Sequence, residues 1–153
     1  MSGGVENVTV QNCVFKDSFS IGSIKAVRGR GGYIRNVRYE NCSMNNENYE
    51  VKACKWFRGA IYIDGFYGLD AFDVNEVLSM DETTPIVEDI IFKNIILKTV
   101  EGYGIYICGL PESPLRNVTL KNVVVDGPLG FYHVNIDNLQ MKHVQVNKCK
   151  ESI

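Results

Sequence analysis

The sequence lacks both a long hydrophobic run and an excess of one charge. Sixteen Lys and Arg residues stand against eighteen Asp and Glu residues, which leaves a formal net charge of −2. A strongly basic balance is typical of nucleic-acid-binding proteins, so no nucleic acid is expected as a partner. No apolar stretch approaches the roughly 20 residues of a membrane-spanning helix, and Met1-Ser2-Gly3-Gly4 does not resemble a signal peptide. We therefore expect no membrane partner either.

Cysteine and histidine are scarce as well. The five cysteines do not have the spacing of a metal site (Cys13, Cys42, Cys54, Cys108, Cys149). The two histidines, His133 and His143, have no neighbouring Ser or Cys motif, so we expect them in strands or at corners. Cys13 and Cys42 are expected to face inward as small apolar residues. The sequence therefore predicts neither a metal site nor a cofactor.

What the chain does contain is one segment repeated five times. The copies begin at Val5, Ile34, Val87, Leu115 and Ile136. Each copy has Asn or Asp at its third position and Asn or His at its eighth (Asn7 and Asn12, Asn36 and Asn41, Asp89 and Asn94, Asn117 and Asn122, Asn138 and His143). Between these positions apolar residues recur at every second place (Val8/Val10, Val37/Tyr39, Ile90/Phe92, Val118/Leu120, Leu139/Met141). Period two is typical of a strand and not of a helix.

The spacing of the copies predicts a solenoid. Successive starts are 29, 53, 28 and 21 residues apart, and we count the 53-residue step as about two ordinary steps. Each interval also holds a shorter apolar run, at 19–24, 60–63, 104–107 and 130–134. Asn tolerates a left-handed turn conformation, and its amide can bond the equivalent Asn one coil away. We therefore predict an all-β fold, a right-handed parallel β-helix of about six coils. A leucine-rich repeat would need a steadier period and more Leu.

One β-helix domain is expected over residues 1–147, with loop insertions near 45–57 and 68–86. The polar tail at 148–153 is expected to be loose. No polar cap precedes the first copy, although a solenoid needs its ends covered. Two interpretations follow: either an N-terminal cap and early coils are missing and the chain is a fragment, or the exposed N-terminal coil edge pairs with a second chain in a homo-oligomer.

The densest charged segment lies between the first two copies. Lys25, Arg28 and Arg30 place three cations within six residues, interleaved with Gly29, Gly31 and Gly32. Cations suit a carboxylate-bearing or phosphorylated ligand, and glycines let the backbone approach it closely. The alternative is a solvated surface turn. The segment is not a phosphate-binding loop, because the strand-loop-helix context and the Lys-Ser/Thr ending are absent.

This segment resembles the C-terminal part of glycoside hydrolase family 28, the polygalacturonases and related pectin hydrolases. The run from Ile24-Lys25 through Arg28-Gly29-Arg30-Gly31-Gly32 to Asn36 is similar to the family pattern Arg-Ile-Lys-x-x-x-Gly-Arg-Gly-Gly. Residues 2–8 are similar to the segment that follows the family's Gly-His-Gly motif. Residues 109–120, which begin Gly109-Leu110-Pro111-Glu112-Ser113-Pro114, resemble its Gly-Leu-Pro-Glu-x-Pro signature. The resemblance covers residues 2–146.

The resemblance implies a right-handed parallel β-helix that hydrolyses the α-1,4-linked galacturonan of pectin in plant cell walls, with inversion. Inversion requires a carboxylic acid and a carboxylate base roughly 6.5–9.5 Å apart. The family's Asn-Thr-Asp, Asp-Asp and Gly-His-Gly motifs do not occur in the sequence. No catalytic residue is therefore assigned, and the chain alone is expected to be inactive. Members of the family are usually secreted or periplasmic.

The resemblance also implies roles in substrate binding. Lys25 aligns with the lysine that binds a galacturonate carboxylate, and Tyr67 matches a tyrosine of the sugar groove. Ser23 stands where the family has Arg, so a bidentate carboxylate partner is missing and recognition of the sugar acid should be weaker.

Three further residues complete the candidate substrate-binding set. Arg28 and Arg30 enter as cations near Lys25, and Asp64 enters because it lies near Tyr67 in the sequence. The alternative for Tyr67 is packing within a loop. For Asp64 it is a turn carboxylate that ends a strand ahead of Gly65.

Two classes of function remain open at the level of the sequence. The first is the C-terminal part of a polygalacturonase-like hydrolase, which carries half of a groove for acidic polysaccharide. The second is a non-enzymatic β-helix module that binds carbohydrate or assembles through its coil edge.

Overall fold

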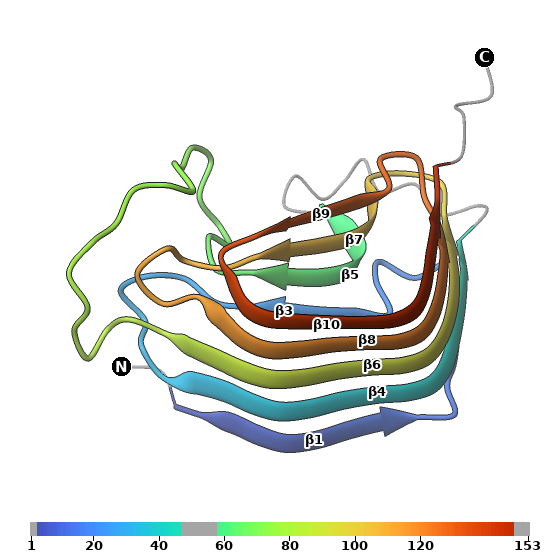
Figure 1. Cartoon of the computed structure of the whole chain (residues 1–153), viewed down its shortest axis with the longest axis horizontal. Helices are drawn as coiled ribbons and strands as arrows, with labels where there is room; N and C mark the ends of the chain where they lie inside the picture. Colours follow the sequence, from blue (N-terminus) through green and yellow to red (C-terminus); the bar gives the residue numbers. More distant parts are fainter. Residues whose placement is uncertain (1–2, 47–57, 149–153) are drawn as a thin grey trace.

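All regular structure in the described residues is β-strand. The computed structural model describes residues 3–46 and 58–148 (Figure 1). One sheet contains the strands β1 (Val5–Gln11), β4 (Tyr33–Asn46), β6 (Ile86–Thr99), β8 (Leu115–Asp126) and β10 (Ile136–Asn147) in that order, with the short β2 (Val14–Lys16) also paired to β4. A second sheet contains β3 (Gly22–Lys25), β5 (Gly59–Asp64), β7 (Tyr103–Cys108) and β9 (Phe131–Val134). Because every strand pairing is parallel and the chain alternates between the sheets, the fold is the predicted parallel β-helix.

The repeated segment sets the register of the long sheet. Val5 pairs with Ile34, Ile34 with Val87, and Leu115 with Ile136, so equivalent positions of the copies stack directly. The direct pairing of β4 with β6 corrects the estimate of about six coils, because the 53-residue step is a single coil. Part of its extra length is the strand-free connection at 65–85, between β5 and β6. The described residues therefore contain five long strands, one for each copy.

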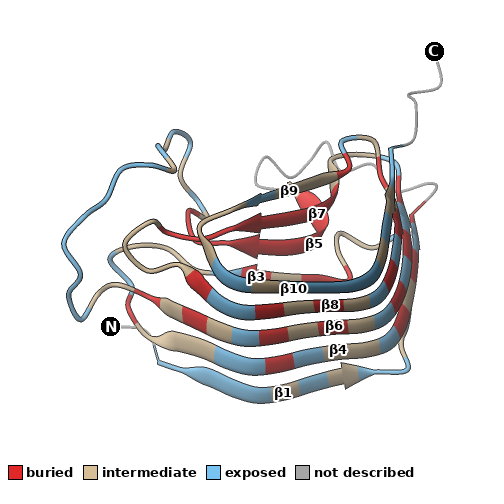
Figure 2. Cartoon of the chain, in the orientation of Figure 1, coloured by how far each residue is buried: buried red, intermediate tan, exposed pale blue. Residues whose placement is uncertain are grey.

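The predicted inward face forms the core. Val37, Ile90, Phe92, Val118 and Leu120 are all buried. Figure 2 shows such buried positions aligned from β4 across β6 to β8. The outer strands β1 and β10 have a neighbour on one side only within the described chain, so Val8 and Leu139 are half-buried. Met141, in register with Leu120, is 47% exposed for the same reason.

The predicted corners are present at the third and eighth positions of every copy. All ten residues there have φ between 52° and 66°, in the left-handed region that Asn tolerates best among residues with a side chain. Their amides form ladders across the coils: Asn94 Nδ2 donates to Asn41 Oδ1 at 2.8 Å, and Asn122 Nδ2 donates to Asn94 Oδ1 at 2.8 Å. His143 continues this ladder, with Nδ1 3.1 Å from Asn122 Oδ1. The expectations for the corners and for His143 are therefore confirmed, and His133 lies on β9 as a strand residue.

Asp89 is the one residue among the ten corner positions whose side chain has no N–H group to donate. Its carboxylate accepts from Asn117 Nδ2 at 2.8 Å, and across the sheet it lies beside Asn36, whose Nδ2 donates to Asn7 Oδ1. Asp89→Asn supplies the amide that Asn36 Oδ1 can accept from, and it keeps the bond from Asn117. We expect the free energy of unfolding in urea at neutral pH to rise by about 0.5 kcal/mol, since the site is exposed.

The matched control for this change is Asp137→Asn, which removes an exposed carboxylate from β10 outside the ladders. If the free energy of unfolding rises as much in Asp137→Asn as in Asp89→Asn, the cause is the loss of a negative charge and not a new hydrogen bond in the ladder.

Several predictions from the sequence fall partly outside the described residues. Residues 45–46 belong to β4, and the rest of the insertion predicted near 45–57 lies outside the described ranges, as do Cys54, Cys149 and residues 149–153 of the tail. Cys42 is buried, and Cys13 packs against the same core. No described segment is a helix with the length and apolarity that crossing a membrane requires.

Candidate functional site

Lys25 and Tyr67 meet at the carboxyl end of the short sheet. Lys25 is the exposed last residue of β3, and Tyr67 follows β5 by three residues. The Lys25 Nζ atom lies 4.6 Å from the centre of the Tyr67 ring and 3.5 Å from Tyr67 Oη. The second distance is at the long limit for a hydrogen bond, so the cation-ring contact is the stronger interaction. The fold thus brings together the two residues that the resemblance assigned to substrate.

A pocket of about 280 Å³ opens beside this pair, and we call it the Lys25 pocket. Its described lining comprises Gly3, Val5, Lys25, Ala26, Val27, Arg30, Gly31, Gly32, Tyr33, Ile34, Tyr67, Pro85 and Ile86. Lys25 and Arg30 contribute positive charge, and this set contains no carboxylate. Tyr33 and Tyr67 add aromatic surface. The pocket therefore combines two cations with apolar walls, which suits an anionic ligand that also has an apolar face.

Gly31 shapes one wall of the Lys25 pocket. Its φ is 61°, and a Cβ atom there would lie 2.3 Å from the carbonyl oxygen of Glu82. The N–H groups of Gly29 and Gly31 both donate to the Thr83 carbonyl, at 3.2 and 2.7 Å. Glycine is required here because the backbone of residues 29–31 packs directly against the 65–85 connection. Gly31, one of the glycines that the sequence assigned to ligand approach, thus has a packing role.

Arg28 lies outside the lining of the Lys25 pocket and binds Glu112. Its Nε and one terminal nitrogen donate to the two carboxylate oxygens of Glu112 at 2.6 and 2.8 Å. The same terminal nitrogen donates to the Glu76 carbonyl at 2.6 Å. The side chains of Arg28 and Glu112 are 18% and 4% exposed. The hydrogen bonds between them raise the pKa of Arg28 and lower the pKa of Glu112.

This ion pair joins three segments. Arg28 belongs to the Gly-rich turn, Glu76 to the 65–85 connection, and Glu112 to the Gly-Leu-Pro-Glu segment that follows β7. Nearby, Ser113 Oγ donates to the Pro85 carbonyl at 2.9 Å. The sequence assigned no role to Glu112, because its partner is 84 residues away.

Asp64 is 1% exposed and has the geometry of a turn carboxylate. Oδ1 accepts from the Phe66 N–H at 2.9 Å, and Oδ2 accepts from the Tyr62 hydroxyl at 2.7 Å. Arg58 Nε lies 3.6 Å from Oδ2. Burial, together with the hydrogen bond to Asp64, raises the pKa of Tyr62. The structure therefore matches the turn interpretation of Asp64, and it places no Asp64 surface in the Lys25 pocket.

Aromatic residues cover the outer face of the short sheet. Tyr62, Tyr106 and Tyr132 are in register on β5, β7 and β9. The rings of Tyr106 and Tyr132 stack with centroids 5.0 Å apart, and those of Tyr62 and Tyr106 are 5.8 Å apart. This row of tyrosines was not predicted from the sequence. Its signal was the similar runs Ile61-Tyr62-Ile63 and Ile105-Tyr106-Ile107, because side chains at matching positions of stacked strands must touch.

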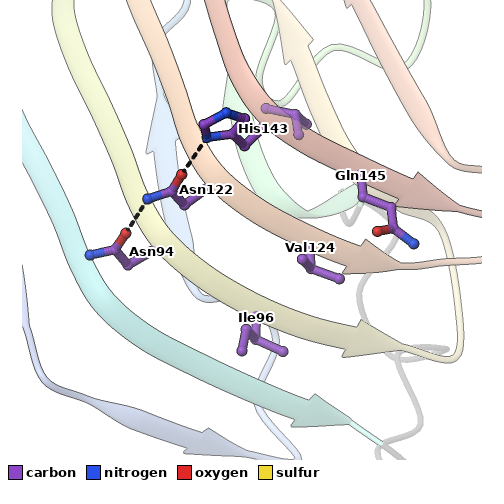
Figure 3. A pocket seen from close by; sticks show the side chains of 7 residues that line it. Asn94, Ile96, Asn122, Val124, His143 and Gln145 are labelled. Carbon is purple, nitrogen blue, oxygen red and sulfur yellow. Dashed lines mark hydrogen bonds between the residues drawn. The ribbon is translucent and has the colours of Figure 1, made fainter.

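A larger concavity, of about 630 Å³, lies on the outside of the long sheet (Figure 3). It is lined by the ladder residues Asn94, Asn122 and His143 and by the next outward row, Ile96, Val124 and Gln145, together with Val144. Ile96 is 66% exposed. This lining contains no Lys, Arg, Asp or Glu, and its one imidazole, His143, has Nδ1 in the hydrogen-bond ladder with Asn122. It therefore lacks the paired cations of the Lys25 pocket. The Lys25 pocket is therefore the candidate site.

The described residues show no group of three His, Cys, Asp or Glu side chains that could hold a metal ion. The side chains of Lys25, Arg30, Tyr33 and Tyr67 supply the candidate site with charge pairing, hydrogen bonding and contact with aromatic rings.

Comparison with known proteins identifies similar sequences in plants. The chain is 26% identical over 125 residues to a probable polygalacturonase of Vitis vinifera, an alignment that covers 82% of this chain and 22% of that protein. It is 25% identical over 122 residues to a probable polygalacturonase of Arabidopsis thaliana, with 80% of this chain and 24% of that protein covered. Neither a family model nor a solved structure matches the chain. The chain is thus polygalacturonase-like in sequence and spans less than a quarter of the length of these two relatives.

Proposed function

We propose that the described coils form part of the galacturonan-binding groove of a family 28, inverting, polygalacturonase-like hydrolase that acts on pectin. The observation that carries the proposal is the Lys25 pocket, in which two cations lie beside aromatic rings. Galacturonan carries a carboxylate on every sugar, so a polymer of this kind presents negative charge at regular intervals. The apolar face of a sugar ring packs well on an aromatic side chain.

In this proposal Lys25 binds a sugar carboxylate as a point charge. Tyr67 lies under the ammonium group and offers its hydroxyl for a hydrogen bond. Arg30 is also exposed and lies on the pocket wall. It binds either a second carboxylate of the galacturonan chain or the carboxylate that Lys25 binds. Ser23, where the family has Arg, is a neutral residue whose Oγ lies 2.6 Å from Ser20 Oγ. Recognition of the sugar carboxylate therefore depends more strongly on Lys25 than it would with an Arg at position 23 of β3.

We further propose that the catalytic carboxylates are not supplied by this chain. The described lining of the Lys25 pocket has no Asp or Glu, and the sequence has none of the three catalytic motifs of the family. An inverting mechanism requires two carboxyl groups on opposite faces of the scissile bond. We expect the chain to bind oligogalacturonate without cleaving it.

Two measurements on the unmodified chain test the proposal. Calorimetric titration with trigalacturonate should give binding that weakens as salt is added, because the contacts are ionic and partly exposed. Neutral trigalactose is the matched control and should bind much less. Equal binding of both sugars would favour the alternative, a β-helix module that does not recognise the acid.

Incubation with polygalacturonate, followed by an assay for reducing ends, tests whether this chain lacks the catalytic carboxylates. We expect no turnover. A robust rate that Asp64→Asn abolishes would show that this chain contains a catalytic carboxylate, and it would overturn the assignment.

A further inference from the structure

Asp64 is a buried carboxylate that the Lys25 pocket does not use directly. It is the last residue of β5, and it lies beside Lys25, the last residue of β3, in the register of the short sheet. A charged group buried to this extent is costly unless its oxygens are satisfied. Each oxygen of Asp64 has its own partner: Phe66 N–H donates to Oδ1, and the Tyr62 hydroxyl donates to Oδ2.

The first oxygen holds a turn. Oδ1 accepts the N–H of Phe66, two residues ahead, which is the hydrogen bond of an Asx turn. The chain then doubles back across the end of β3: the Tyr67 N–H donates to the Ala26 carbonyl at 3.2 Å, and Val27 forms an antiparallel bridge with Phe66. This path carries the Tyr67 ring to Lys25.

The second oxygen fixes the orientation of the carboxylate. The Tyr62 hydroxyl donates to Oδ2 at 2.7 Å, and Arg58 Nε lies 3.6 Å from the same oxygen. Tyr62 is itself held by contact with the Tyr106 ring. The backbone of Asp64 also contributes, because its carbonyl accepts from the Ala26 N–H at 2.9 Å. One residue thus fixes the end of β3 and the start of the turn together.

We propose that Asp64 is a positioning residue for ligand binding: it holds the turn at 64–67 so that Tyr67 lies against Lys25 and orients the ammonium group towards the Lys25 pocket. The ligand part of this inference rests on the proposed function. The positioning itself does not, because the distance between Lys25 and the Tyr67 ring can be followed without ligand.

The ligand-free test is the NMR spectrum of the Lys25 methylene protons, which the Tyr67 ring shifts when it lies 4.6 Å from Nζ. Tyr67→Leu defines the spectrum without the ring. In Asp64→Ala the Lys25 resonances should move towards those of Tyr67→Leu. Asp64→Asn keeps an acceptor for the Phe66 N–H and should keep the resonances of the unmodified chain. Lys25 resonances that stay unchanged in Asp64→Ala, or that move fully in Asp64→Asn, would overturn the proposal.

The ligand test is titration with trigalacturonate. Asp64→Ala should raise Kd about fivefold, and the double variant Asp64→Ala/Tyr67→Leu should bind no more weakly than Tyr67→Leu alone, because Asp64 acts through Tyr67. Additive losses would overturn the proposal. If the unmodified chain fails to bind trigalacturonate, the proposed function is wrong, and the NMR comparison still decides the role of Asp64.

A further variant guards against loss of folding in Asp64→Ala. Asp64→Ser offers the Phe66 N–H a weaker turn acceptor and has no second oxygen for the Tyr62 hydroxyl. A smaller displacement of the Lys25 resonances in the same direction is expected, and their persistence at the positions of the unmodified chain counts against the proposal.

Discussion

Replacing Arg28 with alanine is expected to lower the free energy of unfolding by about 3 kcal/mol, because it leaves the Glu112 carboxylate buried without its partner. Glu112 is 4% exposed and receives two hydrogen bonds from Arg28, at 2.6 and 2.8 Å. The substitution also releases the carbonyl of Glu76, and with it one attachment of the 65–85 connection. Thermal denaturation at pH 7 should show a fall in Tm of about 10 °C for a chain of this size.

The effect of Arg28→Ala should shrink in acid. The folded-state pKa of Glu112 is lowered by Arg28, so the stabilisation from the pair is fully present above the pKa of an unfolded Glu, about 4.3. It is lost as the pH falls through the lower, folded-state value, because the folded state then takes up the proton that the unfolded state already holds. The difference in Tm between Arg28→Ala and the unmodified chain should therefore be smaller at pH 3 than at pH 7.

Arg30→Ala is the matched control for this prediction. Arg30 is two residues away on the same turn and is exposed, so its removal should change the free energy of unfolding by less than about 0.5 kcal/mol. Equal losses in the two variants, or a pH-independent loss in Arg28→Ala, would show that the ion pair with Glu112 is not the cause.

Replacing Lys25 with alanine is expected to raise the Kd for trigalacturonate about tenfold. A hydrogen bond to a charged group contributes roughly 1.5–3 kcal/mol, and the lower end applies because Lys25 is exposed and screened by solvent. The loss should be largest in low salt and should narrow as ionic strength rises, because the removed interaction is ionic. Calorimetric titration at two salt concentrations measures both effects.

The control for Lys25→Ala is Lys142→Ala, which removes an exposed lysine from β10, outside the Lys25 pocket. It carries the same change of net charge and should leave Kd within about twofold. An unchanged titration curve for Lys25→Ala would remove Lys25 from the binding site, while an equal loss in Lys142→Ala would indicate a nonspecific effect of charge.

The strands and corners could be predicted because their causes are local or repeat from coil to coil. Alternation of apolar residues selects a strand, and the inward face follows from period two. Asn at the third and eighth positions of each copy favours a left-handed corner, and the observed φ values of Asn41 and Asn94, 54° and 55°, agree. The number of coils was overestimated because a long step in sequence does not distinguish an extra coil from a long connection such as 65–85.

The candidate site could be predicted in part. Lys25 and Tyr67 are 42 residues apart, so in the sequence only the resemblance to family motifs connects them. The fold brings them into contact. Arg28 and Arg30 look equivalent in the sequence, yet one is bound to Glu112 and the other lies on the pocket wall. The difference arises because the turn at 27–33 directs the two side chains to different neighbours, and those neighbours come from segments far along the chain.

The sequence by itself determined the solenoid, since a segment that cannot bury its apolar face alone is stable only when equivalent copies stack upon it. It also determined which side chains face inward and where the strands bend. Only the tertiary structure decided the roles of the charged residues. Whether a cation such as Arg28 meets a ligand or a carboxylate depends on which distant loop packs beside it, and that packing is set by the whole stack of coils.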